Sequence, residues 1–131
     1  MSDADRPSGP HPIDGQTVLH AGVLASVSPE RLPSLLARVQ RRLAGERETY
    51  RRQFECVHED GDRAVYLVPA DHWTAVGERV GLGRRETDAV RRAHEQQLLR
   101  VGSDAGRREE FENALDIRSA VVVGAAERTG T

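Results

Sequence analysis

Two glycines, Gly81 and Gly83, flank Leu82 and separate two amphipathic segments of the sequence. Apolar residues recur at helical spacing on both sides, over residues 73–80 and 84–101. Glycine adopts the left-handed backbone conformation without the steric penalty of other residues, so this short stretch suits a tight reversal of the chain. The pattern predicts two helices that are joined by a turn and packed against each other.

Helical spacing predicts two more features of the chain. Leucine and valine recur every three or four residues in a segment that begins at Pro33 and ends at Gly45, which predicts a helix. The helix over residues 84–101 is expected to end at Gly102, and a last helix is expected over about residues 107–121. Because only a short loop separates these two helices, they would form a C-terminal αα-hairpin.

Two short runs with alternating side chains predict a β-hairpin. They cover about residues 53–58 and 63–68, and Asp60-Gly61 between them is typical of a two-residue hairpin turn. Such a turn would pair Cys56 with Val65 and would place both side chains on the apolar face. The sequence therefore predicts the hairpin together with a specific register.

The remaining segments complete the predicted domain. Residues 16–26 fit helix or strand, with helix favoured, and residues 120–123 either prolong the last helix or form a final strand. Polar residues, proline and glycine predict disordered tails at residues 1–13 and 124–131. We expect one α+β domain, residues 14–123, mainly α-helical with one β-hairpin.

Composition limits the classes of function. All 19 basic residues are arginine, and against 21 acidic residues they leave a net charge of −2, so only a local basic face could bind nucleic acid. A single cysteine permits no internal disulfide. No apolar run approaches the roughly 18 residues of a membrane helix, and the start does not resemble a secretory signal. We expect a cytoplasmic protein with no membrane partner.

No motif predicts catalysis, a cofactor or a metal site. Glu55 and His58 have the spacing of a helical ligand pair, but a strand places them on opposite faces. Cys56 and His58 share a strand face that His72 could approach as a zinc cluster, although a buried cysteine beside a histidine is far more common. His94 borders the apolar side of its helix and is expected to be packed there. We expect no enzyme and no small-molecule substrate.

The segment from residue 73 to residue 92 resembles the helix-turn-helix of bacterial and archaeal regulators. Thr87 departs from that pattern, which prefers valine or isoleucine there, and Gly83 replaces the usual polar cap of the second helix. Six positions match its apolar, small and turn residues: Val76, Gly77, Val80, Gly81, Leu82 and Val90.

The resemblance implies a DNA-binding second helix. Arginine binds guanine edges or neutralises phosphates, but residues 84–101 contain five arginines against three acids, so the excess charge is small. Residues 29–54 hold seven arginines against three glutamates, which could help or could form an ordinary solvated face. The candidate DNA-binding residues are Arg84, Arg85, Thr87, Asp88, Arg91 and Arg92, with help from Arg38, Arg41 and Arg42.

A second resemblance concerns origin and carries no function. Two stretches, together with the missing lysine, are similar to short proteins of halophilic archaea whose role is not characterised. The stretches are GLGRRETDAVRRAHEQQL and REEFENALDIR.

The alternative to DNA binding is an interaction domain. In so short a chain the apolar stripes of the αα-hairpin need not all be covered internally, and self-association would cover them. The sequence favours this function: a non-enzymatic protein-interaction domain that binds itself or another protein. A helix-turn-helix regulator that uses the helix beginning at Arg84 is the alternative.

Overall fold

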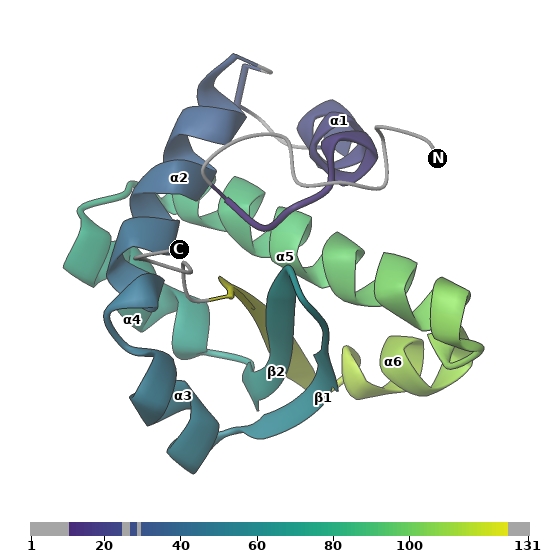
Figure 1. Ribbon diagram of the computed structural model, residues 1–131. Coiled ribbons are helices and arrows are strands. Elements are labelled where there is room, and N and C mark those ends of the chain that lie inside the picture. Colours follow the sequence, from purple (N-terminus) through teal and green to yellow (C-terminus); the bar gives the residue numbers. More distant parts are fainter. Residues whose placement is uncertain (1–10, 25–26, 29, 126–131) are drawn as a thin grey trace, which may run out of the picture.

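The computed structural model describes residues 11–24, 27–28 and 30–125. In this part of the chain, helices surround a three-stranded antiparallel sheet with the order β1-β2-β3 (Figure 1). The predicted α+β architecture with a β-hairpin is confirmed. The elements in chain order are α1 (Gly15–Leu24), α2 (Arg31–Ala44), α3 (Arg47–Gln53), β1 (Glu55–Glu59), β2 (Arg63–Pro69), α4 (His72–Val80), α5 (Arg84–Ala105), α6 (Arg108–Ala114) and β3 (Arg118–Gly124).

The longest helix, α5, lies at the centre of the packing. It runs along the sheet beside β3 and also packs against α1, α4 and α6 (Figure 1). Its inward side carries small and branched side chains at helical spacing, and burial of this stripe stabilises the contact with the sheet. The buried apolar residues of this stripe are Ala89, Val90, Ala93, Leu98 and Val101.

The predicted end of this helix at Gly102 is wrong. Gly102 is buried inside α5, and a Cβ at this position would lie 2.7 Å from Cδ2 of Phe111 on α6. The helix ends instead at Gly106, which adopts the left-handed conformation with φ of 72°. Gly102 therefore does not end α5. Its lack of a side chain allows α6 to pack closely against α5.

The last predicted helix, residues 107–121, is also too long. Helix α6 ends at Ala114, and residues 118–124 form β3, which resolves the open choice at residues 120–123 in favour of a strand. Three consecutive valines favour this result because branched side chains suit a strand that is buried on both faces. Strand β3 pairs with β2 in antiparallel register, with Val122 opposite Val65.

The hairpin is present, but its predicted register is wrong. Cys56 pairs with Tyr66 instead of Val65, and the register shifts by a bulge before His58. The turn is longer than two residues because the carboxylate of Asp60 accepts hydrogen bonds from the backbone N–H of Asp62 and of Arg63, at 2.8 and 3.1 Å. As a consequence, Cys56 lies exposed and not on the core face.

Side chains from three helices close the free edge of β3. The indole N–H of Trp73 on α4 donates to the Ala120 carbonyl at 3.0 Å, and Nδ1 of His94 on α5 accepts from the Val122 N–H at 2.9 Å. The amide of Gln40 on α2 donates to the Val122 carbonyl at 3.3 Å. These contacts satisfy edge groups that would otherwise be available to another chain.

Other boundaries differ from the sequence predictions. Helix α1 confirms the favoured helix in residues 16–26, of which positions 25–26 lie outside the described residues. Residues 11–13, expected in the N-terminal tail, are buried against the domain, and residue 124 ends β3. Ala125, also expected in the C-terminal tail, donates from its N–H to the Asp62 carbonyl at 3.0 Å, and the other tail positions, 1–10 and 126–131, lie outside the described residues.

Two further points concern the helices. Helix α2 begins at Arg31, two residues before Pro33, and α3 was not predicted because Tyr50 is the one buried residue in it. None of the described helices combines the length and the apolar character needed to cross a lipid bilayer.

Candidate nucleic-acid interface

The predicted reversal between α4 and α5 is present and tightly hydrogen-bonded. Gly81 has a φ of 81°, and the N–H groups of Gly81 and Leu82 both donate to the Gly77 carbonyl, at 2.9 and 2.8 Å. A Cβ on Gly77 would lie 2.2 Å from Oγ1 of Thr87, so glycine is required for the close contact of the two helices. Thr87 therefore contacts α4 and does not extend from α5 as a free recognition residue.

The first turn of α5 presents two exposed arginines. The carboxylate of Glu86 caps the helix by accepting from the Gly83 N–H at 2.9 Å, and it also contacts the guanidinium of Arg31. Arg84 and Arg85 are exposed, and neither has a hydrogen bond or an ion pair with another described residue. These two guanidiniums are available for an anionic partner.

The second and third turns of α5 differ, because their arginines are paired. Asp88 accepts from both Arg91 and Arg92, with 2.8 Å between the Arg92 Nε and Asp88 Oδ2, and Arg91 also bonds to Glu95 at 2.8 Å. Partial burial raises the pKa of the Asp88 carboxyl, but the hydrogen bonds from Arg92 and Arg91 outweigh burial and hold it below its usual value. The carboxylate is therefore charged at neutral pH.

Helix α2 brings further arginines to the same turn. The guanidinium of Arg38 donates to the Val80 carbonyl at 2.7 Å, and this nitrogen lies 3.2 Å from where a Cβ on Gly81 would be. Because residues three, four and seven apart share a helix face, the exposed arginines of α2 form one stripe that continues onto this turn. The stripe consists of Arg31, Arg38, Arg41 and Arg42.

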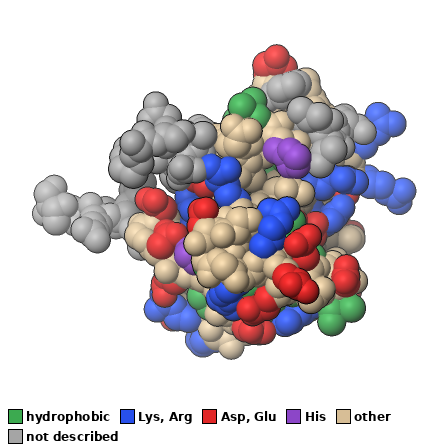
Figure 2. All heavy atoms as spheres, turned by 90° about the vertical axis from the view of Figure 1, so that its right-hand side faces the viewer, with side chains coloured by type: hydrophobic (Ala, Val, Ile, Leu, Met, Phe, Trp, Pro, Cys, Tyr) green, Lys and Arg blue, Asp and Glu red, His purple; other side chains and the backbone are tan. Residues whose placement is uncertain are grey.

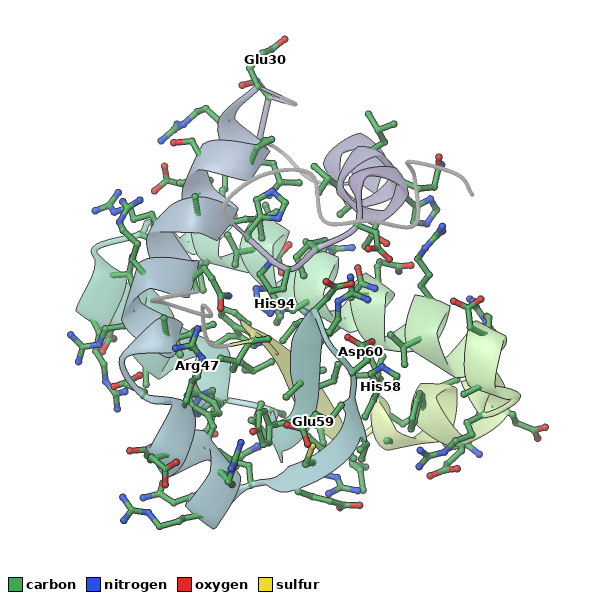
Figure 3. All side chains as sticks on the ribbon, viewed as in Figure 1. Glu30, Arg47, His58, Glu59, Asp60 and His94 are labelled. Atoms are coloured by element: carbon green, nitrogen blue, oxygen red, sulfur yellow. The ribbon has the colours of Figure 1, made fainter. Side chains whose placement is uncertain are left out.

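We use the term basic face for the α2 stripe together with the arginines at the α4–α5 turn. Arg79 of α4 belongs to it, because Glu46 lies 3.8 Å from Arg79 and 3.5 Å from Arg42. Side chains with nitrogen tips extend from the outer side of α2 and from α4 (Figure 3). Two carboxylates, Glu46 and Glu86, contact this set. The residues of the basic face are Arg31, Arg38, Arg41, Arg42, Arg79, Arg84 and Arg85.

Sequence reasoning missed two of these residues. Arg31 lies seven residues before Arg38, so helical spacing could have placed it on the same face. Arg79 could not have been assigned, because its position depends on how α4 packs against α2.

A groove of about 450 Å³ lies between α4 and α5 beside the basic face. Its walls carry charges of both signs, since Glu78 and Asp88 line it together with Arg84 and Arg91. The remaining lining residues are Ala70, Trp73, Thr74, Leu82 and Thr87.

The opposite side of the molecule has a different charge pattern. Figure 2 shows the side of the molecule on which α6 lies, and acidic and basic side chains are interspersed over the lower part of this view. At the start of α6, Arg107, the residue before the helix, pairs with Glu110 at 2.7 Å, and Arg108 lies 3.6 Å from Glu112. Exposed pairs of this kind contribute little to stability and leave no patch of one sign.

The structure separates the residues of the hypothetical zinc cluster. His58 bonds to Asp60 at 2.7 Å, whereas His72 bonds to the Tyr50 hydroxyl at 2.6 Å near α3. The Cys56 thiol donates to the His58 carbonyl at 3.4 Å and remains exposed. Among the described residues, no group of three histidine, cysteine, aspartate or glutamate side chains could hold a metal ion.

His94 is packed in the interior, as predicted. It lies in the interior against the sheet, away from His58 and Asp60 at the hairpin (Figure 3). Burial, with a smaller contribution from the neighbouring His11, lowers the pKa of His94 from 6.5 to about 3. The imidazole is therefore neutral, and its Nδ1 acts as the acceptor for the sheet edge.

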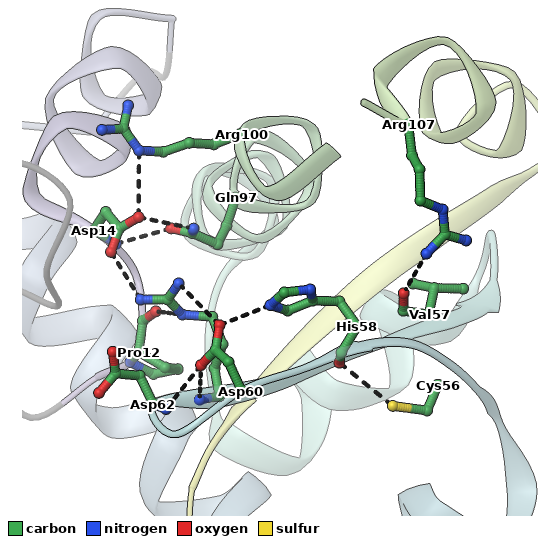
Figure 4. Close-up of polar contacts among 11 residues, drawn as sticks. Pro12, Asp14, Cys56, Val57, His58, Asp60, Asp62, Gln97, Arg100 and Arg107 are labelled. Atoms are coloured by element: carbon green, nitrogen blue, oxygen red, sulfur yellow. Dashed lines mark hydrogen bonds and ion pairs between the residues drawn. The ribbon is translucent and has the colours of Figure 1, made fainter. Parts of the chain in front are cut away.

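A buried polar cluster, which the sequence did not predict, holds the start of α1 (Figure 4). The Asp14 carboxylate accepts from Arg63 of β2 at 2.8 Å and from the Gln97 amide of α5 at 3.0 Å. Arg63 also donates to the Pro12 carbonyl at 2.9 Å, and Arg100 lies 3.3 Å from Asp14. Each polar group links two elements, so the cluster is structural.

Comparison with known proteins gives a family but no function. The sequence from residue 11 to residue 125 matches a family described as a domain of unknown function (DUF8048). No curated protein and no solved structure was found to match the chain. The matched span includes all helices and strands from α1 to β3.

Proposed function

For this chain, which belongs to the DUF8048 family of domains of unknown function, we propose binding of double-stranded DNA through the basic face. The observation that carries the proposal is the bond from Arg38 to the Val80 carbonyl. It fixes the arginine stripe of α2 to the end of α4, at the turn that leads into α5, so that two groups of arginines far apart in the sequence lie next to each other.

The charge of this face suits a phosphate backbone. Each phosphate that arginine neutralises releases counterions, and this term supplies most of the affinity of a nonspecific complex. The whole chain has a net charge of −2, so attraction of a polyanion depends on a local excess of arginine, such as the basic face.

The helix-turn-helix resemblance assigns roles within the face. In such proteins the start of the second helix enters the major groove, and nearby elements contact the backbone. Arg84 and Arg85 would then meet the bases or the nearest phosphates, while the α2 arginines would reach flanking phosphates. Thr87 is assigned to helix packing because its side chain is in contact with Gly77.

Fluorescence anisotropy with a mixed-sequence duplex, titrated at two salt concentrations, tests the proposal. We expect binding that weakens as salt rises. Arg84→Ala combined with Arg85→Ala should weaken binding and reduce the slope of log affinity against log salt by about 1.8, which is about 0.9 for each lost phosphate contact.

The control removes the same charge elsewhere. Arg108→Ala combined with Arg118→Ala changes two exposed or half-exposed arginines outside the basic face and should leave the salt slope of the wild type unchanged. Absence of binding at low salt, or equal losses in the two double variants, would overturn the proposal.

Self-association is the second candidate function, and one observation favours it. The apolar side chain of Leu19 on helix α1 is 64% exposed. Ile117 is the other exposed large apolar residue in the described part of the chain, so the apolar area offered is small. A dimer would also double the number of arginines facing a duplex.

Light scattering over a range of concentrations tests self-association. A mass that rises with concentration in the wild type, and that stays at the monomer value in Leu19→Arg, would support it. A strict monomer at the highest concentration would contradict it.

We further infer a role without catalysis. His94 is buried and engaged by the sheet edge, while His58 and His72 are each hydrogen-bonded to a neighbouring side chain. The proposed partners are therefore macromolecules: DNA first, and otherwise a second copy or another protein.

A further inference from the structure

The carboxylate of Asp88 binds two guanidiniums of α5, those of Arg91 and Arg92. One of its carboxylate oxygens accepts from Arg91, and the other accepts from Nε of Arg92 at 2.8 Å. The three side chains remain partly exposed, with exposed fractions of 41% for Asp88, 30% for Arg91 and 42% for Arg92. Carboxylate and phosphate oxygens bind guanidinium in the same way, so a phosphate could compete for these arginines.

The two arginines differ in how firmly they are held. Arg91 also bonds to Glu95 at 2.8 Å, and Glu95 accepts from the Ser119 hydroxyl of β3 at 2.7 Å. Arg91 is thereby anchored to the sheet. Among the described residues, Arg92 has Asp88 as its one ion-pair partner.

Arg92 also lies in line with the basic face. It follows Arg85 by seven residues, which places both on the same side of α5 two turns apart. If Arg92 were released from Asp88, the row of guanidiniums along this side of α5 would become longer.

We propose that Asp88 lowers the affinity of the basic face for DNA by competing with phosphate for Arg92, while Arg91 stays bound to the fold. The inference rests on the proposed function. The lowered pKa of Asp88 is consistent with this proposal, because a carboxylate that is charged at neutral pH can compete with phosphate for Arg92. Asp88 thus acts as a positioning residue for Arg92.

The test compares the wild type with Asp88→Asn in the same anisotropy titration. Asparagine keeps the shape and removes the charge. We expect binding about threefold tighter at low salt, the size of one exposed charge pair, and a salt slope steeper by about 0.9 because one phosphate contact is gained.

A second variant separates release of Arg92 from a general change in charge. In Arg92→Ala with Asp88→Asn, the gain in affinity and slope should disappear, and Arg92→Ala alone should change wild-type affinity by less than about twofold. Glu112→Gln on α6 makes the same charge change elsewhere and should not tighten binding. Thermal unfolding followed by circular dichroism checks that each variant is folded.

The outcomes distinguish the two proposals. If the wild type binds DNA but Asp88→Asn binds no tighter, or if the gain persists without Arg92, this inference is overturned and the proposed function stands. If neither the wild type nor Asp88→Asn binds at low salt, the proposed function is overturned and this inference falls with it.

Discussion

His94 shows how a single buried group couples stability to pH. Its imidazole lies in the core, where Nδ1 must be unprotonated to accept from the Val122 N–H. Protonation would remove this acceptor and place a charge among apolar residues. The lowered pKa of His94 follows from this environment.

This arrangement predicts loss of stability in acid. The pKa of His94 is about 3 in the folded chain against 6.5 in the unfolded chain, so the unfolded state binds the proton first. The stabilisation is complete above pH 6.5 and declines by about 1.4 kcal/mol per pH unit as the pH falls toward 3. Urea unfolding at a series of pH values measures this slope.

His94→Gln provides the control for that slope. Glutamine offers an oxygen acceptor that does not titrate in this range. The free energy of unfolding of the variant should therefore fall less steeply with decreasing pH, by about 1.4 kcal/mol per pH unit, which is the contribution of one proton. The part that remains would come from other groups, including His11 and His72, whose pKa values burial also lowers. An identical slope in the variant would show that His94 does not control acid stability.

At the scale of elements, the contact between α4 and α5 depends on Gly77. An added Cβ would lie 2.2 Å from Oγ1 and 2.9 Å from Cγ2 of Thr87, so the helices or the threonine would have to shift. Gly77→Ala should therefore destabilise the fold by about 1–3 kcal/mol, even though alanine favours helix by up to about 1 kcal/mol. Thermal or urea unfolding measures the change.

Removing the side chain that causes the clash should reverse the effect. In Gly77→Ala with Thr87→Ala, most of the lost stability should return, because the two nearest atoms, Oγ1 and Cγ2 of Thr87, are absent and only its Cβ, at 3.1 Å, remains close to the new Cβ. Equal destabilisation of the single and double variants would mean that something other than this contact makes glycine necessary.

The elements also show what the sequence could and could not predict. Helices α2 and α5 were predictable because their buried residues recur at helical spacing. The hairpin register was not, because the Asp60 side chain lengthens the turn and a bulge follows Cys56. Gly102 looked like a helix end because its role, contact with α6, depends on a neighbour that sequence spacing does not reveal.

The same division applies to the candidate site. The arginines at the start of α5 and on α2 could be predicted from exposed helical positions. The contact of Arg38 with the Val80 carbonyl, which brings the α2 arginines next to the α4–α5 turn, depends on tertiary packing, and so does the anchoring of Arg91 through Glu95 to Ser119. Sequence reasoning therefore overestimated how many α5 arginines are available and missed Arg79, which α4 contributes.

At the scale of the whole molecule, the Asp14 cluster joins distant parts of the chain. Asp14 precedes α1, Arg63 begins β2 and Gln97 lies on α5, and the side chains of Arg63 and Asp14 are only 6% and 4% exposed. A buried charge is costly unless it is paired, so the attraction between Asp14 and Arg63 offsets the cost of removing both charges from water. The cluster thereby holds the N-terminal segment against both the sheet and the central helix.

Replacing Asp14 alone should therefore reduce the free energy of unfolding more than replacing both Asp14 and Arg63. Asp14→Ala leaves the buried Arg63 guanidinium with only the more distant carboxylate of Asp60, at 3.9 Å, and should lower the free energy of unfolding by about 3 kcal/mol. Asp14→Ala with Arg63→Met replaces the charge by an apolar side chain of similar length and should recover a large part of that loss. Urea unfolding of the two variants provides the comparison, and a single variant within about 1 kcal/mol of wild type would contradict it.

The same pair of variants separates stability from DNA binding. The basic face lies on α2, α4 and the start of α5, and none of its arginines contacts the Asp14 cluster. At a temperature where both variants are folded, their anisotropy titrations should match the wild type in affinity and salt slope. A loss of DNA binding that followed the loss of stability would instead mean that the Asp14 cluster positions the basic face, and that the two regions are coupled through α5.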